Sequence, residues 1–172
     1  LGVPQQPAGT HSISDMARAA RLASRTLAKC STRQKNTLLY TMADRIEANS
    51  ERIRSENRKD IEYAREKGLS AAMIDRLTVS SATVLSMSAG LREVAMLPDP
   101  VSEISRVWNR PNGLQVSKMR IPLGVIAIIY ESRPNVTIDA AGLCLKAGNA
   151  AILRGGSEAL HSNRILAEII RQ

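Results

Sequence analysis

Two short polar loops near the end of the chain combine residue types that can bind a nucleotide. One loop, residues 130–135 (YESRPN), and the other, residues 154–158 (RGGSE), each follow an apolar run typical of a buried strand. In open α/β sheets, ligands bind beyond the carboxyl ends of the strands, where such loops lie. Arg154 supplies a fixed cation, Ser157 a hydroxyl group and Glu158 two acceptor oxygens. This set of groups suits a ribose with a phosphate beside it.

The second loop also has a simpler interpretation. Gly155 and Gly156 permit a ligand to approach the backbone closely, but a Gly-Gly-Ser segment also suits a loop that only leads into a helix. Neither of the standard phosphate-binding patterns, GxGxxG and GxxxxGK(S/T), is present in the chain. The residues alone therefore leave both interpretations open.

The elements that position these loops form a β-α-β-α pattern. Residues 124–130 (GVIAIIY) are a continuous apolar run, which predicts a strand buried on both faces. A helix capped by Thr137 is expected next, then a short strand at residues 150–153 and a last helix whose apolar face includes Ile165 and Ile169. This order predicts an α/β fold that contains the first half of a doubly wound parallel sheet with right-handed crossovers.

The preceding part of the chain is predicted to be a helical segment followed by a β-hairpin. Ser12 or Ser14 is expected to cap a first helix whose apolar residues recur at helical spacing, and Gly68 ends the third helix. After Pro100 two extended segments flank Pro111-Asn112-Gly113, a strong turn signal. The expected organisation is a loose leader (1–12), a helical part of the nucleotide-binding domain (13–100), a β-hairpin (101–120) and the start of a Rossmann-like βαβα unit (121–172).

Composition argues against several classes of protein. The chain has 172 residues, 44% hydrophobic and 23% charged, which is typical of a globular domain and not of a disordered, collagen-like or coiled-coil protein. No apolar run approaches the ~20 residues that a membrane span requires. The net charge is +8, but the charges are spread along the chain and only 2% of the residues are aromatic. We therefore expect a surface suited to anionic small molecules, without nucleic-acid or membrane binding.

Cysteine and histidine usage points to a reducing compartment. Two cysteines do not make a disulfide framework, and no signal peptide is evident, so we expect a cytoplasmic location. The two histidines and two cysteines show no metal-ligand spacing, and no metal site is expected.

Four motifs between Met119 and Asn163 carry a resemblance to known proteins. They are PLGV at residues 122–125, KAGNA at residues 146–150, YESRPNV after the first strand and LRGGSEA after the second. The first two resemble the wider aldehyde dehydrogenase superfamily, and the last two resemble the γ-glutamyl phosphate reductase family specifically. Weaker similarity extends over DRLT (Asp75 to Thr78) and over residues 90–100.

The resemblance implies an aldehyde-dehydrogenase-like fold and an oxidoreductase of proline biosynthesis. Members of the family reduce L-glutamyl 5-phosphate to L-glutamate 5-semialdehyde with NADPH and release phosphate. A cysteine thiolate attacks the acyl phosphate, hydride reduces the resulting thioester, and an oxyanion hole stabilises the developing negative charge. The resemblance also implies NADP(H) as the cofactor, homo-oligomers formed through the hairpin at residues 101–120, and glutamate 5-kinase as a partner.

The resemblance further implies roles for the loop residues. Arg154 matches a basic residue that contacts the adenosine ribose or its 2′-phosphate, which is consistent with NADP, although NAD enzymes also carry a cation at this position. Ser157 and Glu158 match a Ser-Glu pair near the ribose, where Gly155 and Gly156 replace a single proline. The expected cofactor-binding residues are Ser132, Pro134, Arg154, Gly155, Gly156, Ser157 and Glu158.

Two residues of the first loop are candidates for contacts with the reacting group. The superfamily's oxyanion asparagine follows the first strand by a short loop. Aligned without gaps, Arg133 occupies that position, and with a two-residue shift Asn135 does; we assign the oxyanion role to Asn135. Arg133 is chemically suited to bind the substrate's phosphate or carboxylate as a bidentate cation.

The nucleophilic cysteine is expected outside this chain, in a later catalytic domain. Cys144 lies on the apolar face of a predicted helix and Cys30 lies at the end of the first helix, and neither stands in a sequence like the family's nucleophile motif. We therefore expect the chain to be inactive alone. Two alternatives are a non-enzymatic basic helical module that binds acidic partners, and a nucleotide-binding fragment without catalysis.

Overall fold

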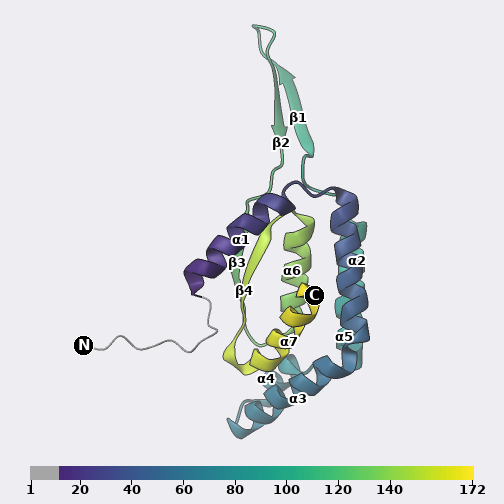
Figure 1. Cartoon of the computed structure of the whole chain (residues 1–172), viewed down its shortest axis with the longest axis vertical. Coiled ribbons are helices and arrows are strands. Elements are labelled where there is room, and N and C mark those ends of the chain that lie inside the picture. The colour runs from purple at the N-terminus through teal and green to yellow at the C-terminus, as the bar shows by residue number, and fades with distance from the viewer. Residues whose placement is uncertain (1–11) are drawn as a thin grey trace, which may run out of the picture.

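The computed structural model describes residues 12–172, so the expected leader lies, except for Ser12, outside the described residues. Helices come first, followed by a β-hairpin and a β-α-β-α unit, which confirms the predicted α/β fold class (Figure 1). The elements are α1 (Ile13–Leu27), α2 (Thr32–Ala48), α3 (Ser50–Glu66), α4 (Ala71–Leu77), α5 (Ser81–Met96), β1 (Ile104–Asn109), β2 (Gln115–Met119), β3 (Val125–Ile129), α6 (Asn135–Lys146), β4 (Ala150–Arg154), the short 3₁₀ helix η1 (Ser157–Ala159) and α7 (Leu160–Arg171).

Serine side chains cap several of the helices. Ser12, the first of the two candidates, begins α1 and accepts a hydrogen bond from the Asp15 backbone N–H (3.1 Å). Ser31 begins α2 in a capping box, because the Gln34 side chain in turn accepts a hydrogen bond from the Ser31 backbone N–H (2.8 Å). Ser80 begins α5 in the same way. These bonds satisfy N–H groups that the first helical turn leaves without partners, so the local sequence fixes where these helices start.

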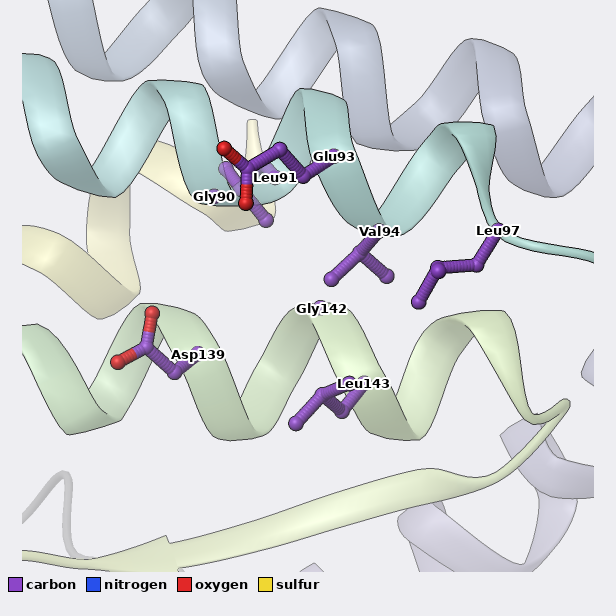
Figure 2. Close-up of a pocket in the computed structure, with 8 residues that line it drawn as sticks. All are labelled: Gly90, Leu91, Glu93, Val94, Leu97, Asp139, Gly142 and Leu143. Atoms are coloured by element: carbon purple, nitrogen blue, oxygen red, sulfur yellow. The ribbon is translucent and has the colours of Figure 1, made fainter.

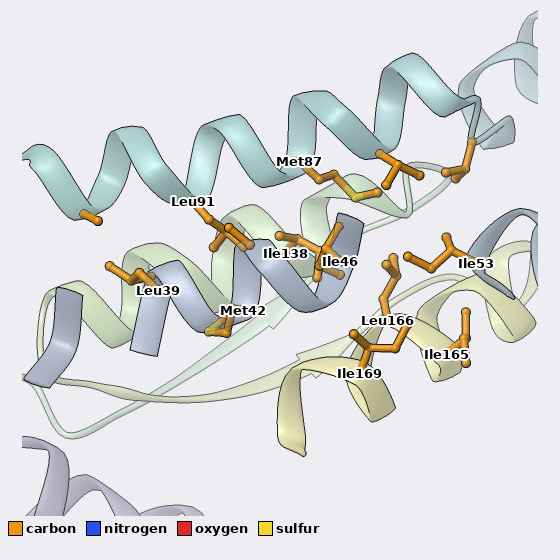
Figure 3. Packing of buried hydrophobic residues seen from close by; sticks show 14 residues of the cluster. Leu39, Met42, Ile46, Ile53, Met87, Leu91, Ile138, Ile165, Leu166 and Ile169 are labelled. Atoms are coloured by element: carbon orange, nitrogen blue, oxygen red, sulfur yellow. The ribbon is translucent and has the colours of Figure 1, made fainter. Parts of the chain in front are cut away.

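The hydrophobic core lies between α2, α5, α6 and α7 (Figure 3). Leu39 and Ile46 of α2, Ile138 of α6, and Leu166 and Ile169 of α7 are fully buried. Their helical spacing places them on one face of each helix, and that face packs against the other helices. The helical segment and the β-α-β-α unit therefore share one core.

The strands β3 and β4 pair in parallel, with Val125 opposite Ala150 and Ile129 opposite Arg154. Helix α6 connects them and packs on β4, whereas α1 packs on the other side of the small sheet (Figure 1). The prediction that the first strand is buried on both faces is wrong for this chain, because Ile129 is 77% exposed. The reason is that α1 lies mainly against β4 and leaves most of β3 uncovered.

The strands β1 and β2 form the predicted hairpin, which extends away from the rest of the chain (Figure 1). Trp108 lies opposite Val116, and Gly113 in the turn has a φ of 83°, which favours glycine. Except for Val116, every strand residue is exposed. The hairpin is therefore held mainly by its own ladder and turn.

Residues 12–172 contain neither a candidate membrane-spanning helix nor a candidate metal site. No helix there is both long enough and apolar enough to cross a membrane. The same residues hold no group of three or more His, Cys, Asp and Glu side chains placed to bind a metal ion.

Candidate functional site

The two polar loops indicated by the sequence meet at one edge of the small sheet. Because β3 and β4 are parallel neighbours, the loops that follow them emerge at the same ends of the strands. The Tyr130 backbone N–H still donates to the Arg154 carbonyl oxygen (3.1 Å), so the strands remain paired up to the start of both loops. The structure therefore brings residues 130–135 and 154–158 together.

A carboxylate joins the two loops. Glu158 Oε1 accepts hydrogen bonds from the Ser132 backbone N–H (2.7 Å) and the Ser132 hydroxyl (3.2 Å). Ser132 is buried and has a φ of 56°, a left-handed conformation that residues other than glycine rarely adopt. One of the two acceptor oxygens that the sequence suggested for a ribose is therefore already used within the protein.

The same contacts decide the charge of Glu158. Burial raises the pKa of this carboxyl, but hydrogen bonds from its own backbone N–H and from Ser132, together with the charge of Arg154, outweigh burial and lower the pKa. Glu158 is therefore ionised at neutral pH, and the Ser132 donors bind a charged acceptor.

Side chains of the protein occupy the space beside both glycines. A Cβ atom at Gly156 would collide with the Glu158 carboxylate, and a Cβ atom at Gly155 would collide with the Asn163 amide. Neither glycine has a positive φ, so lack of space, and not backbone conformation, favours glycine here. Glycine at these two positions therefore leaves room for the Glu158 carboxylate and the Asn163 amide.

A second set of hydrogen bonds connects the elements next to the two loops. The Thr137 hydroxyl donates to Asn163 Oδ1 (2.9 Å) and lies 2.6 Å from the Tyr130 hydroxyl. Since Thr137 gives its proton to Asn163, Tyr130 is the donor of the other bond. These bonds link the end of β3, the first turn of α6 and the first turn of α7.

The prediction that Thr137 caps the helix after the first strand is therefore wrong. Helix α6 begins at Asn135, directly after Pro134, and Thr137 lies buried in its first turn. Proline suits a helix start because its fixed φ fits the first turn and its missing N–H has no partner to lose.

The remaining predicted residues differ in exposure. Arg154 and Ser157 are exposed at the end of β4 and the start of η1, and both are accessible to a ligand. Arg133 is also exposed, whereas Pro134 is buried. Asn135 is half-buried, and its amide donates to Asp139 Oδ2 (3.3 Å) one turn along α6.

A cavity of about 270 Å³ lies between α5 and α6, next to Asp139 (Figure 2). Figure 2 shows the side chains of Val94 in α5 and of Leu97 directly after it pointing toward α6. Burial raises the pKa of Asp139, and the hydrogen bond from Asn135 opposes that effect. No sequence motif indicated this cavity, because Leu97 directly after α5 and ordinary helix positions form its walls: Gly90, Leu91, Glu93, Val94, Asp139, Gly142 and Leu143.

A larger, mostly apolar groove of about 780 Å³ runs between α1 and the helices on the other side of β4. Its lining includes the hydrogen-bonded residues Tyr130, Thr137 and Asn163. The groove therefore borders the loop junction, whereas Arg154 and Ser157 lie outside it.

A buried polar cluster behind the second loop has no counterpart in the sequence prediction. Asp60 of α3 accepts hydrogen bonds from the backbone N–H groups of His161 (3.0 Å) and Ser162 (2.7 Å). Asn57 donates to the Ser162 hydroxyl (2.9 Å) and to the Leu77 carbonyl oxygen (2.8 Å). The available signal was two polar residues on the otherwise apolar face of α3, a pattern that indicates a buried partner.

The α/β architecture, with ligand-type loops at the ends of two parallel strands, defines the class of protein. Residues 4–172 match the model of the aldehyde dehydrogenase family, and the chain belongs to that family. Within it, the chain is similar to γ-glutamyl phosphate reductases. It is 60% identical over 158 residues to the γ-glutamyl phosphate reductase of Desulfatibacillum aliphaticivorans, which covers 92% of this chain and 38% of that protein.

Solved structures agree with this similarity. The γ-glutamyl phosphate reductase of Thermotoga maritima is 38% identical with a TM-score of 0.90, covering 94% of this chain and 39% of that one. The enzyme of the same name from Saccharomyces cerevisiae is 33% identical with a TM-score of 0.88, covering 94% and 41%. The predicted aldehyde-dehydrogenase-like fold and the resemblance to the reductases are confirmed. The chain spans less than half the length of these relatives.

Proposed function

We propose that the polypeptide to which this chain belongs reduces L-glutamyl 5-phosphate to L-glutamate 5-semialdehyde with NADPH and releases phosphate. The observation that carries the proposal is the junction of residues 130–135 and 154–158 at the ends of β3 and β4, in a chain 60% identical to a curated reductase. This chain would supply part of the nucleotide site and the loop that faces the substrate.

The exposed groups of the junction fit NADP(H). Arg154 offers a cation for the ribose or its 2′-phosphate, and Ser157 offers a hydroxyl beside it. When bound, NADPH supplies the hydride for the acyl carbon. Ser132 and Pro134 are buried, so we assign them to support of the loop beneath the nucleotide.

Two groups on the first loop are proposed to act on the substrate. The Arg133 guanidinium is exposed and suits a phosphate or carboxylate group. The Asn135 amide is proposed to stabilise the oxyanion through the N–H of its Nδ2 that does not donate to Asp139.

We propose that the nucleophile lies in a later segment and that this chain alone is inactive. Cys144 is 6% exposed, and burial raises the pKa of its thiol, so little thiolate forms at neutral pH. Cys30 is half-buried after the end of α1, with its Sγ 3.6 Å from the Thr26 carbonyl oxygen. Neither cysteine belongs to the loop junction.

The hairpin supports a proposal about assembly. An isolated two-stranded hairpin is only marginally stable in water, and the hairpin exposes Val107, Trp108 and Leu114. We propose that it pairs with another copy of the protein. Sedimentation velocity checks this: Trp108→Glu should shift the assembly toward monomer, whereas Ser105→Glu, a change of the same charge, should shift it less. We further propose a cytoplasmic location, with glutamate 5-kinase as the partner because phosphorylation of the glutamate side-chain carboxylate supplies the acyl phosphate.

Titration of the chain with NADPH, followed by nucleotide fluorescence, tests the proposed function. Arg154→Ala should weaken binding by about 1–3 kcal/mol, because it removes a charge-assisted contact. Arg164→Ala, an exposed arginine of α7, is the matched control and should leave the affinity unchanged. Equal losses in both variants, with salt-sensitive binding to any polyanion, would support the basic interaction module instead.

A further inference from the structure

We propose that Glu158 is a positioning residue that holds the loop of residues 130–135 in place before any nucleotide binds. Through its contact with Ser132, the carboxylate fixes the segment that presents Arg133 and Asn135. The roles of Arg133 and Asn135 rest on the proposed function, whereas the contact between Glu158 and Ser132 does not.

The Ser132 backbone is buried in an unfavourable conformation. Ser132 is 9% exposed, and its N–H donates to Glu158 across the junction. A buried N–H without a partner is strongly unfavourable. The left-handed conformation of Ser132 is itself unfavourable for a residue with a side chain. Both features persist because an ionised acceptor lies 2.7 Å away.

A short connection joins Ser132 to Arg133 and Asn135. Arg133 is the next residue, and its backbone N–H donates to the Glu131 carbonyl oxygen (2.8 Å), which forms a tight turn. Asn135 then begins α6. A change in the backbone at Ser132 therefore moves Arg133 directly and alters the start of α6.

Gly156 leaves space for the Glu158 carboxylate. A Cβ atom there would collide with the carboxylate, yet the backbone of Gly156 has a φ of −66°, which alanine also adopts. Gly156→Ala is therefore expected to displace the Glu158 side chain while the backbone keeps its conformation. This variant removes the contact without removing the glutamate.

Amide hydrogen exchange of the chain without nucleotide tests the proposal. Glu158→Ala should raise the exchange rate of the Ser132 amide on the order of 10- to 100-fold, because a hydrogen bond to a charged group is lost. Gly156→Ala should raise it in the same way, and Glu158→Gln, which keeps an acceptor oxygen, should raise it less. Glu131→Ala, an exposed carboxylate on the same loop, is the control and should leave the rate unchanged.

The opposite pattern overturns the proposal. If Glu158→Ala and Gly156→Ala leave the Ser132 amide at the wild-type rate while core amides such as that of Leu166 are also unchanged, Glu158 does not position the loop. If Glu158→Ala does not fold, Gly156→Ala and Glu158→Gln decide the question by the same comparison. Because no nucleotide is present, a failure of NADPH to bind would overturn the proposed function and leave this result intact.

Steady-state kinetics of the full natural polypeptide that contains this chain distinguish two roles of Glu158. One role is to position the loop of residues 130–135, and the other is to bind the ribose. At saturating NADPH, Glu158→Ala should lower kcat/KM for the acyl phosphate by roughly 10-fold or more, and Glu158→Gln should recover most of the loss. A change confined to the KM for NADPH would show that Glu158 acts only on the nucleotide, and would overturn the proposal.

Discussion

The Asp60 carboxylate of α3 accepts two hydrogen bonds from Ser162 of α7, one from its backbone N–H (2.7 Å) and one from its hydroxyl (2.6 Å). Helix α7 has no side-chain cap of its own, because Ala159 occupies the capping position. A carboxylate from a distant helix therefore satisfies N–H groups in the first turn of α7 and interacts favourably with its helix dipole. The contact fixes α7, and with it the 154–158 loop, to the helical segment.

Asp60→Ala should lower the free energy of unfolding by about 2–3 kcal/mol, because buried donors of His161 and Ser162 lose a charged acceptor. Asp60→Asn keeps one acceptor oxygen and should cost less. Urea denaturation followed by circular dichroism measures both, with Glu62→Ala, an exposed carboxylate of the same helix, as the control. A loss no greater than that of the control would contradict the capping role.

A second buried carboxylate contact makes stability depend on pH. Lys35 is 1% exposed, and its Nζ lies 2.5 Å from Asp99 Oδ2, which also accepts from the Thr32 hydroxyl (2.7 Å). Burial raises the pKa of Asp99, but the hydrogen bonds from Lys35, Thr32 and the Val101 backbone outweigh it and lower the pKa below the ordinary 3.8. The stabilisation is therefore present above pH 3.8 and is lost as the pH falls through the lower pKa of the folded state.

Asp99→Asn should destabilise the chain by about 3 kcal/mol at pH 7, because Lys35 then remains buried without a counter-charge. Below the lowered pKa of Asp99, the wild type also carries a neutral side chain, so the two proteins should approach equal stability. Urea denaturation at pH 7 and at a series of acidic values checks this. The same difference in stability at every pH would show that the charge of Asp99 contributes nothing.

Local patterns were sufficient to predict the order of the elements. The turn at Pro111-Asn112-Gly113 and the apolar runs before the two loops each follow from a few neighbouring residues. The meeting of the two loops then follows from the parallel pairing of β3 and β4 alone.

Contacts between distant residues were beyond this kind of prediction. Asp60 and Ser162 are 102 positions apart, and no local pattern relates them. The bond between Glu158 and Ser132 depends on a left-handed serine, a conformation that the sequence does not favour. The exposure of Ile129 depends on where α1 packs, which the apolar spacing of α1 does not determine.

The two cysteines should react at very different rates with a thiol reagent. Cys144 is buried, and burial raises the pKa of its thiol, whereas Cys30 is half-exposed. At neutral pH the folded chain should therefore release one equivalent of thionitrobenzoate quickly from Ellman's reagent, and a second only after denaturation in urea. Cys30→Ser should remove the fast phase. Two fast equivalents in the folded chain would contradict the burial of Cys144.

The hydrogen bonds of Thr137 with Tyr130 and Asn163 should make these residues energetically coupled. Thr137→Val keeps the shape but leaves the Tyr130 hydroxyl and the Asn163 carbonyl without their partner, and should cost about 1–3 kcal/mol. Tyr130→Phe removes the same bond from the other side, so the double variant should lose less than the sum of the two single losses. Urea denaturation of the four proteins completes this cycle. Additive losses would mean that the two hydroxyls do not interact.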